Sequence, residues 1–469
     1  MEPVKLSDLL TCDPKLEIIG IGDPEIVQLT EDSRQVQPGA LFFARTGTAH
    51  DGAAYVDEAL RRGAVAIVTT TYHADVKAIQ IITPNVAKLM GEIASRFYRE
   101  PSNELLLIGV TGTSGKTSVT YWLRYFFEAL GLPCGLIGTI EWVGLEAREA
   151  PLTTPSSLEI HALLDEMVRA GFAACVMEVS SHSLDQERVA GLHFDAAIFT
   201  NLTPEHLDYH KTMEAYGAAK AKLFQLAPLA ILNKEDPFAE KIGPIGEIVW
   251  YGAGGECFYD GIDLHMFGTS ASVDLSAFAP FQIANLLAAI STLCRLGHAL
   301  DTLIELIPRF PGVPGRMEEV ENPLGIRIVV DYAHKPDALE KVLQTLKKQT
   351  EGRLLLVFGC GGERDREKRP VMGAIAARNA DLTWVTSDNP RGEDPLAIME
   401  EILKGCPDAQ REVNRTQAIF AAIENAEPGD TVLIAGRGHE KYQLIGSERI
   451  PLHDASCAKA ISKKNLNTV

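Results

Sequence analysis

The chain has 469 residues, enough for about three domains. With 46% hydrophobic and 23% charged residues, its composition is that of an ordinary soluble globular protein. The formal net charge of −19 argues against a nucleic-acid backbone as the main partner, because phosphate binding along a strand requires a basic surface. A small anion held by a few local arginines and lysines remains compatible with this charge.

The eight cysteines are scattered and form no C-x-x-C pair, so neither a zinc ribbon nor a disulfide framework is indicated. Residues 1–20 carry acidic residues and prolines where a signal peptide requires an apolar core. No apolar run reaches the roughly 18 residues that a membrane span needs. We therefore expect reduced thiols, a cytoplasmic location and no insertion into a membrane.

The first hundred residues contain short apolar runs and helical patterns. Strands are expected over 64–69 and 79–82, and helices over 53–62 and 86–98. Asp32-Ser33-Arg34 is typical of a loop, and Pro38-Gly39 of a turn. Pro101-Ser102 ends the last helical pattern, and we expect a domain boundary there.

The next segment is the most informative part of the chain. An apolar run over 106–111 leads into Gly112-Thr113-Ser114-Gly115-Lys116-Thr117 and then into a helical pattern. Backbone N–H groups of such a loop bind phosphate oxygens, the lysine reaches the terminal phosphates and the threonine hydroxyl binds Mg²⁺. The segment therefore predicts a nucleoside triphosphate site. Val110 stands where the usual pattern has its first glycine, which argues against ordinary GTPases and motor ATPases.

The middle of the chain alternates strands and helices, which predicts a largely parallel sheet covered on both faces. Strands are expected over 173–179, 196–200 and 229–232, and helices over 157–170, 212–226 and 281–296. The Gly- and Ser-rich stretch 252–279 has short alternating runs and is expected to add antiparallel strands. The Pro-Gly cluster over 308–315 predicts a second domain boundary.

Two strands of this middle section end in side chains that suit a metal or a phosphate. Glu178 comes at the end of its strand, where a carboxylate beside a P-loop is well placed for Mg²⁺. The alternative, a solvated acid that caps the next helix, is less favoured. Residues 205–210 hold two histidines and two acids after the following strand, so a ligand role and a structural role both stay open for them.

The last section repeats one pattern four times. Strands are expected over 326–330, 354–358, 382–386 and 432–435. Each is followed by a polar or glycine-rich loop, over 331–334, 359–364, 388–391 and 436–440. Because ligands of open α/β sheets bind beyond the carboxyl ends of the strands, these loops predict one binding face.

Four segments in combination resemble the Mur ligases of bacterial cell-wall synthesis. They are the P-loop, Glu178-Val179-Ser180-Ser181-His182, His206-Leu207-Asp208-Tyr209-His210 and Ala218-Ala219-Lys220. The resemblance extends through all three sections and is greatest to the members that add the third amino acid. It implies an α/β fold of three domains: an N-terminal UDP-substrate domain (1–101), a central P-loop ATPase domain with a mainly parallel sheet (102–315) and a C-terminal Rossmann-like domain that binds the amino acid (316–469).

The resemblance implies two Mg²⁺ ions near Thr117, Glu178, His206 and Lys220, and a catalytic group made of Lys116, Glu178, His206 and Lys220. Lys220 would carry a carbamate made from CO₂ (N6-carboxylysine), since an ammonium repels Mg²⁺ whereas a carbamate supplies an anionic oxygen. Judged from the residues alone, Lys220 would be an exposed helix lysine. Three positions depart from the family pattern, which usually has Asp, Asn and Thr there. They are Glu205, Leu152 and Lys335.

Further site residues are implied by their match to family positions. The ATP-binding set is Gly112, Thr113, Ser114, Gly115, Lys116, Thr117, Asn285, Arg316 and Asp331, with His334 in the same loop as Asp331. The set for the UDP substrate is Ser33, Thr48, Ala49, His50, Thr153, Thr154, Ser180, Gln186 and Arg188. Without the resemblance, Thr153-Thr154-Pro155 would be interpreted as the start of a helix.

The loop Asp388-Asn389-Pro390-Arg391 is expected to select the amino acid. Meso-diaminopimelate is a lysine with an additional carboxylate at its far end, and arginine offers a planar pair of donors for such a group. Arg391 fits this role better than that of a surface turn residue. The resemblance implies that Arg364 also binds an acid group, that Glu440 balances the far ammonium and that Asn389 and Gly436 supply polar contacts.

The activity implied is ATP-dependent addition of meso-diaminopimelate to the D-Glu side chain of UDP-N-acetylmuramoyl-L-Ala-D-Glu (UDP-MurNAc-L-Ala-D-Glu) through an acyl phosphate, by an enzyme expected to be a monomer. The alternatives are a lysine-adding Mur ligase, a folylpolyglutamate-type ligase and a non-catalytic nucleotide-binding scaffold. The Asn-Pro-Arg loop disfavours lysine, and the UDP-side motifs disfavour folate. The complete set of catalytic residues disfavours the scaffold.

Overall fold

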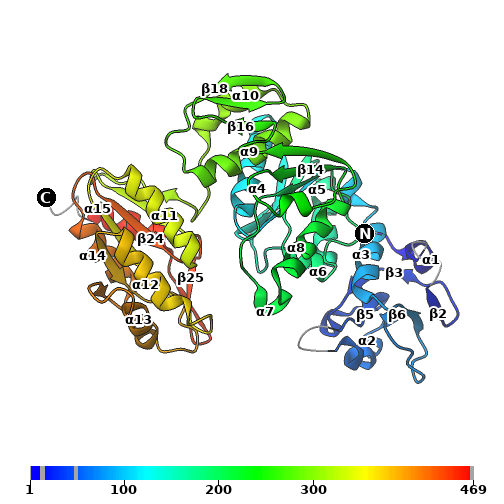
Figure 1. The fold of residues 1–469 in the computed structure, drawn as a ribbon. Coiled ribbons are helices and arrows are strands. Elements are labelled where there is room, and N and C mark those ends of the chain that lie inside the picture. Colours follow the sequence, from blue (N-terminus) through cyan, green and yellow to red (C-terminus); the bar gives the residue numbers. More distant parts are fainter. Residues whose placement is uncertain (1, 11–15, 47–50, 465–469) are drawn as a thin grey trace. The chain divides into compact units, whose positions relative to one another are not determined.

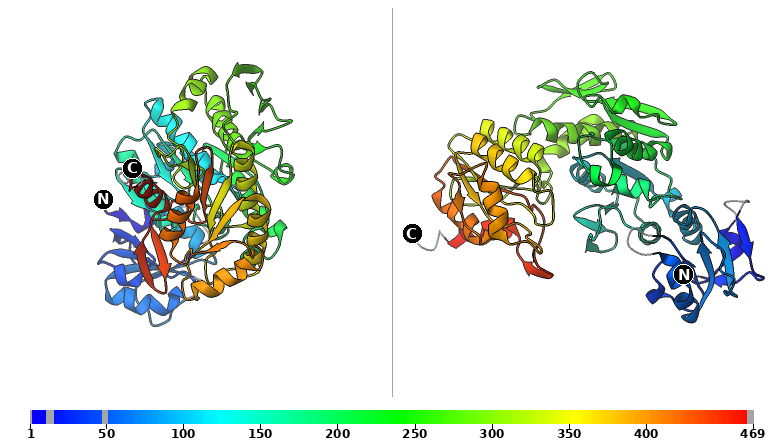
Figure 2. Two further views of the ribbon diagram at one scale, coloured as in Figure 1. Left: turned by 90° about the vertical axis from the view of Figure 1, so that its left-hand side faces the viewer. Right: turned by 60° about the horizontal axis from the view of Figure 1, so that its bottom comes forward.

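The computed structural model describes residues 2–10, 16–46 and 51–464, with side chains described as far as residue 460 (Figures 1 and 2). The chain divides into two compact units, Met1–Phe310 and Pro311–Val469. Each unit is built from parallel sheets covered by helices, as the alternation of strands and helices in the sequence predicts.

The first unit begins with a five-stranded sheet of order β2-β7-β6-β5-β4, in which only the β2–β7 pair is antiparallel. Its strands are β2 (Glu17–Ile19), β4 (Gln28–Thr30), β5 (Ala40–Phe43), β6 (Ala64–Thr69) and β7 (Ile79–Ile82), with helices α2 (Val56–Arg61) and α3 (Val86–Phe97). A small ladder of β1 (Val4–Lys5) and β3 (Glu25–Ile26) flanks α1 (Leu6–Leu9). The predicted strands and the helix over 86–98 are confirmed, whereas the helix predicted over 53–62 is a 3₁₀ turn, Gly52–Tyr55, followed by α2. The fully buried β5 was missed, because four apolar residues after a turn carry little pattern of their own.

An eleven-stranded sheet forms the middle of the first unit. Its parallel centre runs β9 (Cys134–Ile137), β12 (Ala174–Glu178), β8 (Leu106–Thr111), β13 (Ala196–Phe199), β14 (Leu229–Asn233), β15 (Glu247–Tyr251) and β16 (Cys257–Tyr259). Antiparallel strands extend both edges: β10 (Glu141–Val143) and β11 (Ala147–Glu149) at one, and β17 (Asp263–Met266) and β18 (Thr269–Ser272) at the other. The predicted antiparallel addition within 252–279 is therefore confirmed.

Helices cover both faces of this sheet. Alternate residues of β8 enter different cores, with Ile108 and Val110 on the side of α4 and α9 and Leu107 on the side of α5. The helices are α4 (Lys116–Ala129), α5 (Ser157–Arg169), α6 (Ser181–Asp185), α7 (Leu207–His210), α8 (Met213–Ala221), α9 (Pro280–Arg295) and α10 (Leu300–Leu306). The helix predicted over 212–226 is in fact α8 followed by a 3₁₀ turn, Lys222–Gln225.

The second unit contains a six-stranded sheet of order β19-β20-β24-β21-β22-β23, parallel except for β19. Its strands are β19 (Glu318–Glu319), β20 (Arg327–Asp331), β21 (Leu354–Phe358), β22 (Leu382–Val385), β23 (Gln410–Arg411) and β24 (Thr431–Ala435). A hairpin of β25 (Tyr442–Ile445) and β26 (Glu448–Pro451) follows. All four predicted strands are confirmed, and because they are parallel neighbours their four loops leave the same edge of the sheet.

Helices also cover both faces of this second sheet. α14 (Arg415–Asn425) and α15 (Asp454–Lys464) pack on one face. α11 (Pro336–Gln349), α12 (Lys368–Asn379) and α13 (Pro395–Leu403) lie side by side over the other (Figure 1). Throughout the described ranges, no helix is long and apolar enough to cross a membrane. The seven cysteines in these ranges are free thiols.

Candidate active site

The P-loop connects β8 to α4 and is folded by two glycines. Gly112 has φ +149° and Gly115 has φ +89°, a left-handed value that disfavours any side chain. A Cβ atom at Gly112 would collide with Thr200 Oγ1, and one at Gly115 would collide with Asn285 Oδ1. The loop is thus closed against β13 and α9, and Asn285, which is assigned to ATP binding by resemblance, lies directly against it.

Two lysines from different helices converge on one carbonyl group of this loop. Lys116 Nζ donates to Gly112 O at 2.8 Å and to Thr113 O at 3.1 Å. Lys220 Nζ donates to the same Gly112 O at 2.9 Å and lies 4.5 Å from the centre of the Tyr216 ring. Lys220 is only 1% exposed, so the expectation of an exposed helix lysine from residues alone is wrong. The two ammonium groups concentrate positive charge beside a loop built for phosphate.

Glu178 brings a buried carboxylate to the same place. Its Oε1 accepts hydrogen bonds from Thr117 Oγ1 at 3.0 Å and Thr139 N at 2.8 Å, and its Oε2 accepts one from Thr139 Oγ1 at 3.0 Å. The parallel register sets Glu178 level with Val110, immediately before the P-loop. The carboxylate and the hydroxyl that were expected to bind Mg²⁺ are therefore in direct contact. Thr139 was missed by sequence reasoning, because it lies in an irregular bend after β9.

His206 belongs to a cluster of aromatic rings beside α8. It has φ +56° and its Nε2 lies 3.3 Å from Glu205 Oε1, so the longer acid at this position contacts the histidine. The His182 ring centre lies 4.7 Å from that of His206. Burial lowers the pKa of His182 and of His210, and His210 Nε2 lies 3.0 Å from Ser181 Oγ. The two histidines of this run thus differ in exposure. His206 is half-exposed, whereas His210 is buried and contacts the first residue of α6.

The residues assigned to the sugar-peptide side form one hydrogen-bonded network with the end of β12. Thr154 Oγ1 donates to Glu178 O at 2.8 Å and accepts from Ser180 N at 3.1 Å. Arg188 donates through Nη1 to Thr154 O at 2.9 Å and through Nη2 to Gln186 Oε1 at 2.7 Å. α5 begins only at Ser157, so this threonine precedes the helix.

Thr153 and Leu152 lie next to this network in the sequence. Thr153 Oγ1 lies 3.1 Å from Thr139 Oγ1 and can donate to it, which ties Thr153 to the hydroxyl that binds Glu178. The side chain of Leu152 is exposed, and its carbonyl accepts a hydrogen bond from Trp142 Nε1 at 3.2 Å. Leu152 therefore offers only its backbone at the position where the family usually has asparagine.

The remaining residues of the UDP set belong to the first section of the chain. Ser33 is buried and its Oγ donates to Glu58 Oε2 at 2.9 Å, so in this structure its hydroxyl binds a neighbouring helix. Thr48, Ala49 and His50 lie outside the described residues. Of this set, only the contact of Ser33 with Glu58 is described.

In the second unit, Asp331 and Arg316 lie at the carboxyl end of β20. Asp331 accepts hydrogen bonds from Met317 N and Ala333 N, both at 2.8 Å, and burial raises the pKa of its carboxyl. The Arg316 guanidinium lies 4.6 Å from the centre of the Tyr332 ring, and its buried Nε has no hydrogen-bond partner in the described part of the chain. The Tyr332 ring also contacts His334 and His439.

The loops after β22 and β24 meet at the same edge. Asn389 Nδ2 donates to Glu440 Oε2 at 2.7 Å, and a Cβ atom at Gly436 would come within 2.7 Å of Asp388 Oδ2. Burial and the nearby Asp388 carboxylate raise the pKa of Glu440. Acidic and amide groups thus face one another across the two loops.

The two arginines assigned to the amino acid lie on neighbouring loops. Arg391 Nη1 donates to Gly362 O at 2.8 Å, so this arginine bridges to the loop after β21. Arg364, at the end of that loop, is exposed and donates to Glu363 O at 3.1 Å. Pro390 also lies against Gly362, because a Cβ atom there would collide with Pro390 O. Three of the four predicted loops therefore converge here.

The sequence pattern missed the buried Arg415 and Asp454 beneath them, since charged residues at helix starts are normally solvated.

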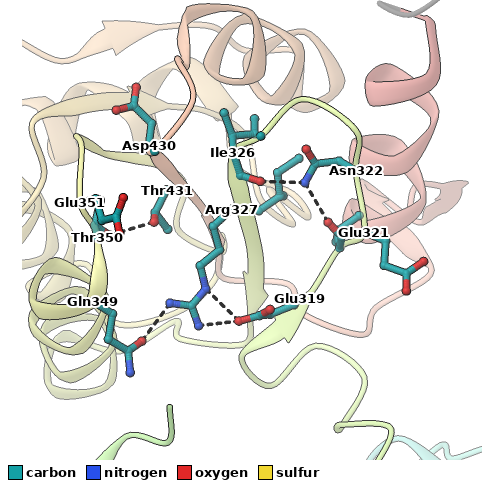
Figure 3. Close-up of a pocket in the computed structure, with 14 residues that line it drawn as sticks. Glu319, Glu321, Asn322, Ile326, Arg327, Gln349, Thr350, Glu351, Asp430 and Thr431 are labelled. Carbon is teal, nitrogen blue, oxygen red and sulfur yellow. Dashed lines mark hydrogen bonds and ion pairs between the residues drawn. The ribbon is translucent and has the colours of Figure 1, made fainter. Parts of the chain in front are cut away.

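A pocket lies at the opposite edge of this sheet, away from the four loops. Its volume is about 450 Å³, and it is formed around the amino ends of β20 and β24 (Figure 3). Arg327 joins its walls by donating to Glu319 Oε1 at 2.8 Å and Gln349 Oε1 at 2.9 Å. None of the predicted site residues lines it.

Comparison with known proteins places the chain among established relatives. Three family profiles match: "Mur ligase family, catalytic domain" over 25–98, "Mur ligase middle domain" over 110–293 and "Mur ligase, glutamate ligase domain" over 315–438. The UDP-N-acetylmuramoyl-L-alanyl-D-glutamate–2,6-diaminopimelate ligase of Synechococcus elongatus is 43% identical to this chain. The alignment covers 93% of this chain and 94% of that ligase.

Two solved structures have the same fold. A structure titled as a UDP-N-acetylmuramoyl-L-alanyl-D-glutamate–2,6-diaminopimelate ligase is 30% identical with a TM-score of 0.74, covering 99% of this chain and all of that one. MurF ligase from Thermotoga maritima in complex with ADP is 20% identical with a TM-score of 0.63, covering 94% and 98%. The predicted three-domain α/β fold with a mainly parallel central sheet is confirmed, and the chain belongs to the Mur ligase family.

Proposed function

We propose that this protein is an ATP-dependent ligase that adds meso-diaminopimelate to the D-Glu side chain of UDP-MurNAc-L-Ala-D-Glu in peptidoglycan precursor synthesis. One observation carries the proposal. Lys116, Lys220 and the Thr117–Glu178 pair meet at the P-loop of a chain that is closely similar, over nearly its full length, to ligases named for this reaction. Lysine addition and folate glutamylation are the alternatives that the proposal replaces.

The chemistry follows from the poor leaving group of a carboxylate. ATP phosphorylates the D-Glu side-chain carboxylate, and the acyl phosphate then carries phosphate as its leaving group. The free amine of the amino acid attacks the acyl carbon, and the tetrahedral intermediate collapses to an amide and phosphate. Since no enzyme nucleophile is required, the protein acts by positioning, charge neutralisation and exclusion of water. Lys116 suits the neutralising role, because its ammonium lies within the P-loop.

The residues around Lys220 fit two Mg²⁺ ions and a carbamate. Mg²⁺ prefers carboxylate, hydroxyl and phosphate oxygens, and the Thr117 hydroxyl already contacts the buried Glu178 carboxylate. Thr117, Glu178, His206 and a carboxylated Lys220 would hold the ions, which would offset the charge of the phosphates. Converting the Lys220 ammonium to a carbamate would replace its positive charge with a negative one and leave one N–H on Nζ for the hydrogen bond to Gly112 O.

The edge of the second sheet suits an amino acid with two ammonium and two carboxylate groups. Arg391 and Arg364 supply donors for carboxylates, and Glu440 with Asp388 supplies negative charge for an ammonium. The nearby Arg316 and Asp331 suit the ATP side of the same unit. Lysine has no second carboxylate to occupy an arginine, which is why meso-diaminopimelate is the preferred substrate in this proposal.

We further propose the domain limits 1–101, 102–315 and 316–469, a monomeric enzyme and a cytoplasmic location. Free thiols throughout the described ranges agree with a reducing compartment, and ATP is a substrate available there. The UDP contacts assigned to Ser33 and to residues 48–50 belong to the same proposal. Sedimentation equilibrium of the purified chain tests the monomer.

Phosphate release measured with each substrate omitted in turn tests the function. We expect release only when ATP, Mg²⁺, UDP-MurNAc-L-Ala-D-Glu and meso-diaminopimelate are all present, with mass spectrometry showing the tripeptide product. A panel with lysine, ornithine and glutamate in place of meso-diaminopimelate measures the preference. Equal or faster product formation with lysine would contradict the proposed substrate, and no product with any amino acid would contradict the enzyme.

A further inference from the structure

Three charged side chains lie completely buried behind the amino-acid loops of the second unit. Arg415 is the first residue of α14, Asp454 is the first residue of α15, and Arg437 is the second residue after β24. The side chains of all three have no exposed surface. Buried charges destabilise a fold unless they are paired and hydrogen-bonded, so the partners of this group identify the segments that it holds.

Arg415 joins three separate segments with one guanidinium group. Its Nε and Nη2 donate to the two carboxylate oxygens of Asp454 at 2.9 and 2.7 Å. Nη2 also donates to Ala435 O at 2.9 Å, and Nη1 donates to Ser387 O at 3.4 Å. These two carbonyl groups belong to the residues directly before Gly436 and Asp388. A single planar side chain therefore bridges the residues that precede the two loops assigned to the amino acid.

Arg437 connects the second of these loops to the same acid. Its Nη2 donates to Leu452 O at 2.9 Å, its Nη1 donates to Asp454 Oδ1 at 3.4 Å and its Nε lies 3.7 Å from Glu440 Oε2. Two guanidinium groups thus face three carboxylates, those of Asp454, Glu440 and Asp388.

We propose that Arg415, acting through Asp454, is a positioning residue for the amino-acid substrate. It holds the loop 436–440 and the loop 388–391 at the separation at which Glu440 binds the far ammonium and Arg391 binds the far carboxylate of one diamino acid. This inference rests on the proposed function and extends it to residues that do not touch the substrate. A residue needed only for folding would affect all three substrates alike, whereas a positioning residue of these loops affects the amino acid alone.

Arg415→Lys tests the role, because lysine keeps the charge but cannot join three acceptors in one plane. We expect KM for meso-diaminopimelate to rise at least tenfold, with KM for ATP, KM for the UDP substrate and kcat all within threefold of wild type. Asp454→Asn keeps the shape and removes the charge, and should produce the same selective rise. The double variant should be no worse than the poorer single variant, because both changes break one linkage.

Arg353→Lys is the matched control. Arg353 donates to Asp430 Oδ2 at 2.7 Å through Nη2 and to Asn425 O at 2.9 Å, so it makes the same kind of linkage, but at the edge of the sheet with the pocket of Figure 3. Arg353→Lys should lower the thermal unfolding temperature of the protein without raising KM for meso-diaminopimelate.

The outcomes separate the positioning role from the function on which it rests. If Arg415→Lys does not fold, Asp454→Asn decides by the same KM comparison. An unchanged KM for meso-diaminopimelate, or three KM values that rise together, contradicts the positioning role while the wild-type enzyme still forms product. A wild-type enzyme that forms no product contradicts the proposed function itself.

Discussion

Lys116 and Lys220 donate hydrogen bonds to the same acceptor, the carbonyl oxygen of Gly112, at 2.8 and 2.9 Å. The two lysines are more than a hundred residues apart in sequence and lie on different helices, α4 and α8. Their meeting point is the first residue of the P-loop. Any change in the charge of Lys220 therefore acts directly on the loop that binds phosphate.

Removal of Lys220 tests the proposed carbamate. Lys220→Ala should lower kcat roughly 100-fold or more, because a charge-stabilising group at the reacting phosphates is lost. Added formate or acetate should restore part of the activity by occupying the place of the carbamate. Lys222→Ala is the control, since Lys222 is exposed and pairs with Asp185. Full activity of untreated Lys220→Ala would refute the carbamate.

Alanine at Gly115 and at Gly131 separates the effect of backbone strain from the effect of a side-chain clash inside the P-loop. Gly115→Ala forces alanine into a left-handed conformation and pushes its Cβ into Asn285, so we expect loss of ATP binding and a stability loss above 1 kcal/mol. Gly131→Ala is matched in φ, at +78°, but has open space around its Cβ. It should cost about 1 kcal/mol in unfolding free energy and leave KM for ATP unchanged. Equal KM for ATP in both variants would show that the P-loop tolerates a side chain there.

Arg391 is expected to decide between meso-diaminopimelate and lysine. Arg391→Ala should raise KM for meso-diaminopimelate by about 10- to 100-fold, the effect of losing a charged hydrogen-bond donor, and leave KM for lysine nearly unchanged. Arg366→Ala removes an exposed arginine that pairs with Glu401 and serves as the control. The check is the ratio of kcat/KM for the two amino acids, and an unaltered ratio would place specificity elsewhere.

The raised pKa of Glu440 predicts a pH dependence of amino-acid binding. Burial and the neighbouring Asp388 favour the protonated carboxyl, whereas Asn389, Arg437 and Arg415 favour the carboxylate. An ammonium is bound only by the carboxylate, so KM for meso-diaminopimelate should rise as the pH falls through this pKa and stay level above it. Glu440→Gln should raise KM at high pH and abolish that dependence. A wild-type KM that is constant down to the pKa of an ordinary glutamate would contradict the assignment.

The sequence alone was sufficient for the parts of this protein that depend on local pattern. The P-loop, the strand and helix alternation and the four loops after parallel strands could be read from spacing, because strand period, turn glycines and helix starts are short-range properties. The family followed from a few such segments in combination. Glu178 and Asp331, the last residues of β12 and β20, and Asp388, in the loop after β22, were found in the same way.

Tertiary structure decided what depends on contacts between distant residues. It buried Lys220 against Gly112, whereas its local pattern suggests an exposed helix lysine. It joined Thr139 to Glu178, and it placed Arg415 and Asp454 beneath the loops. Burial and charge pairing arise when separate strands and helices pack together, so no local spacing carries them. The chain order determines which loops share an edge, but only packing determines how far apart they are held.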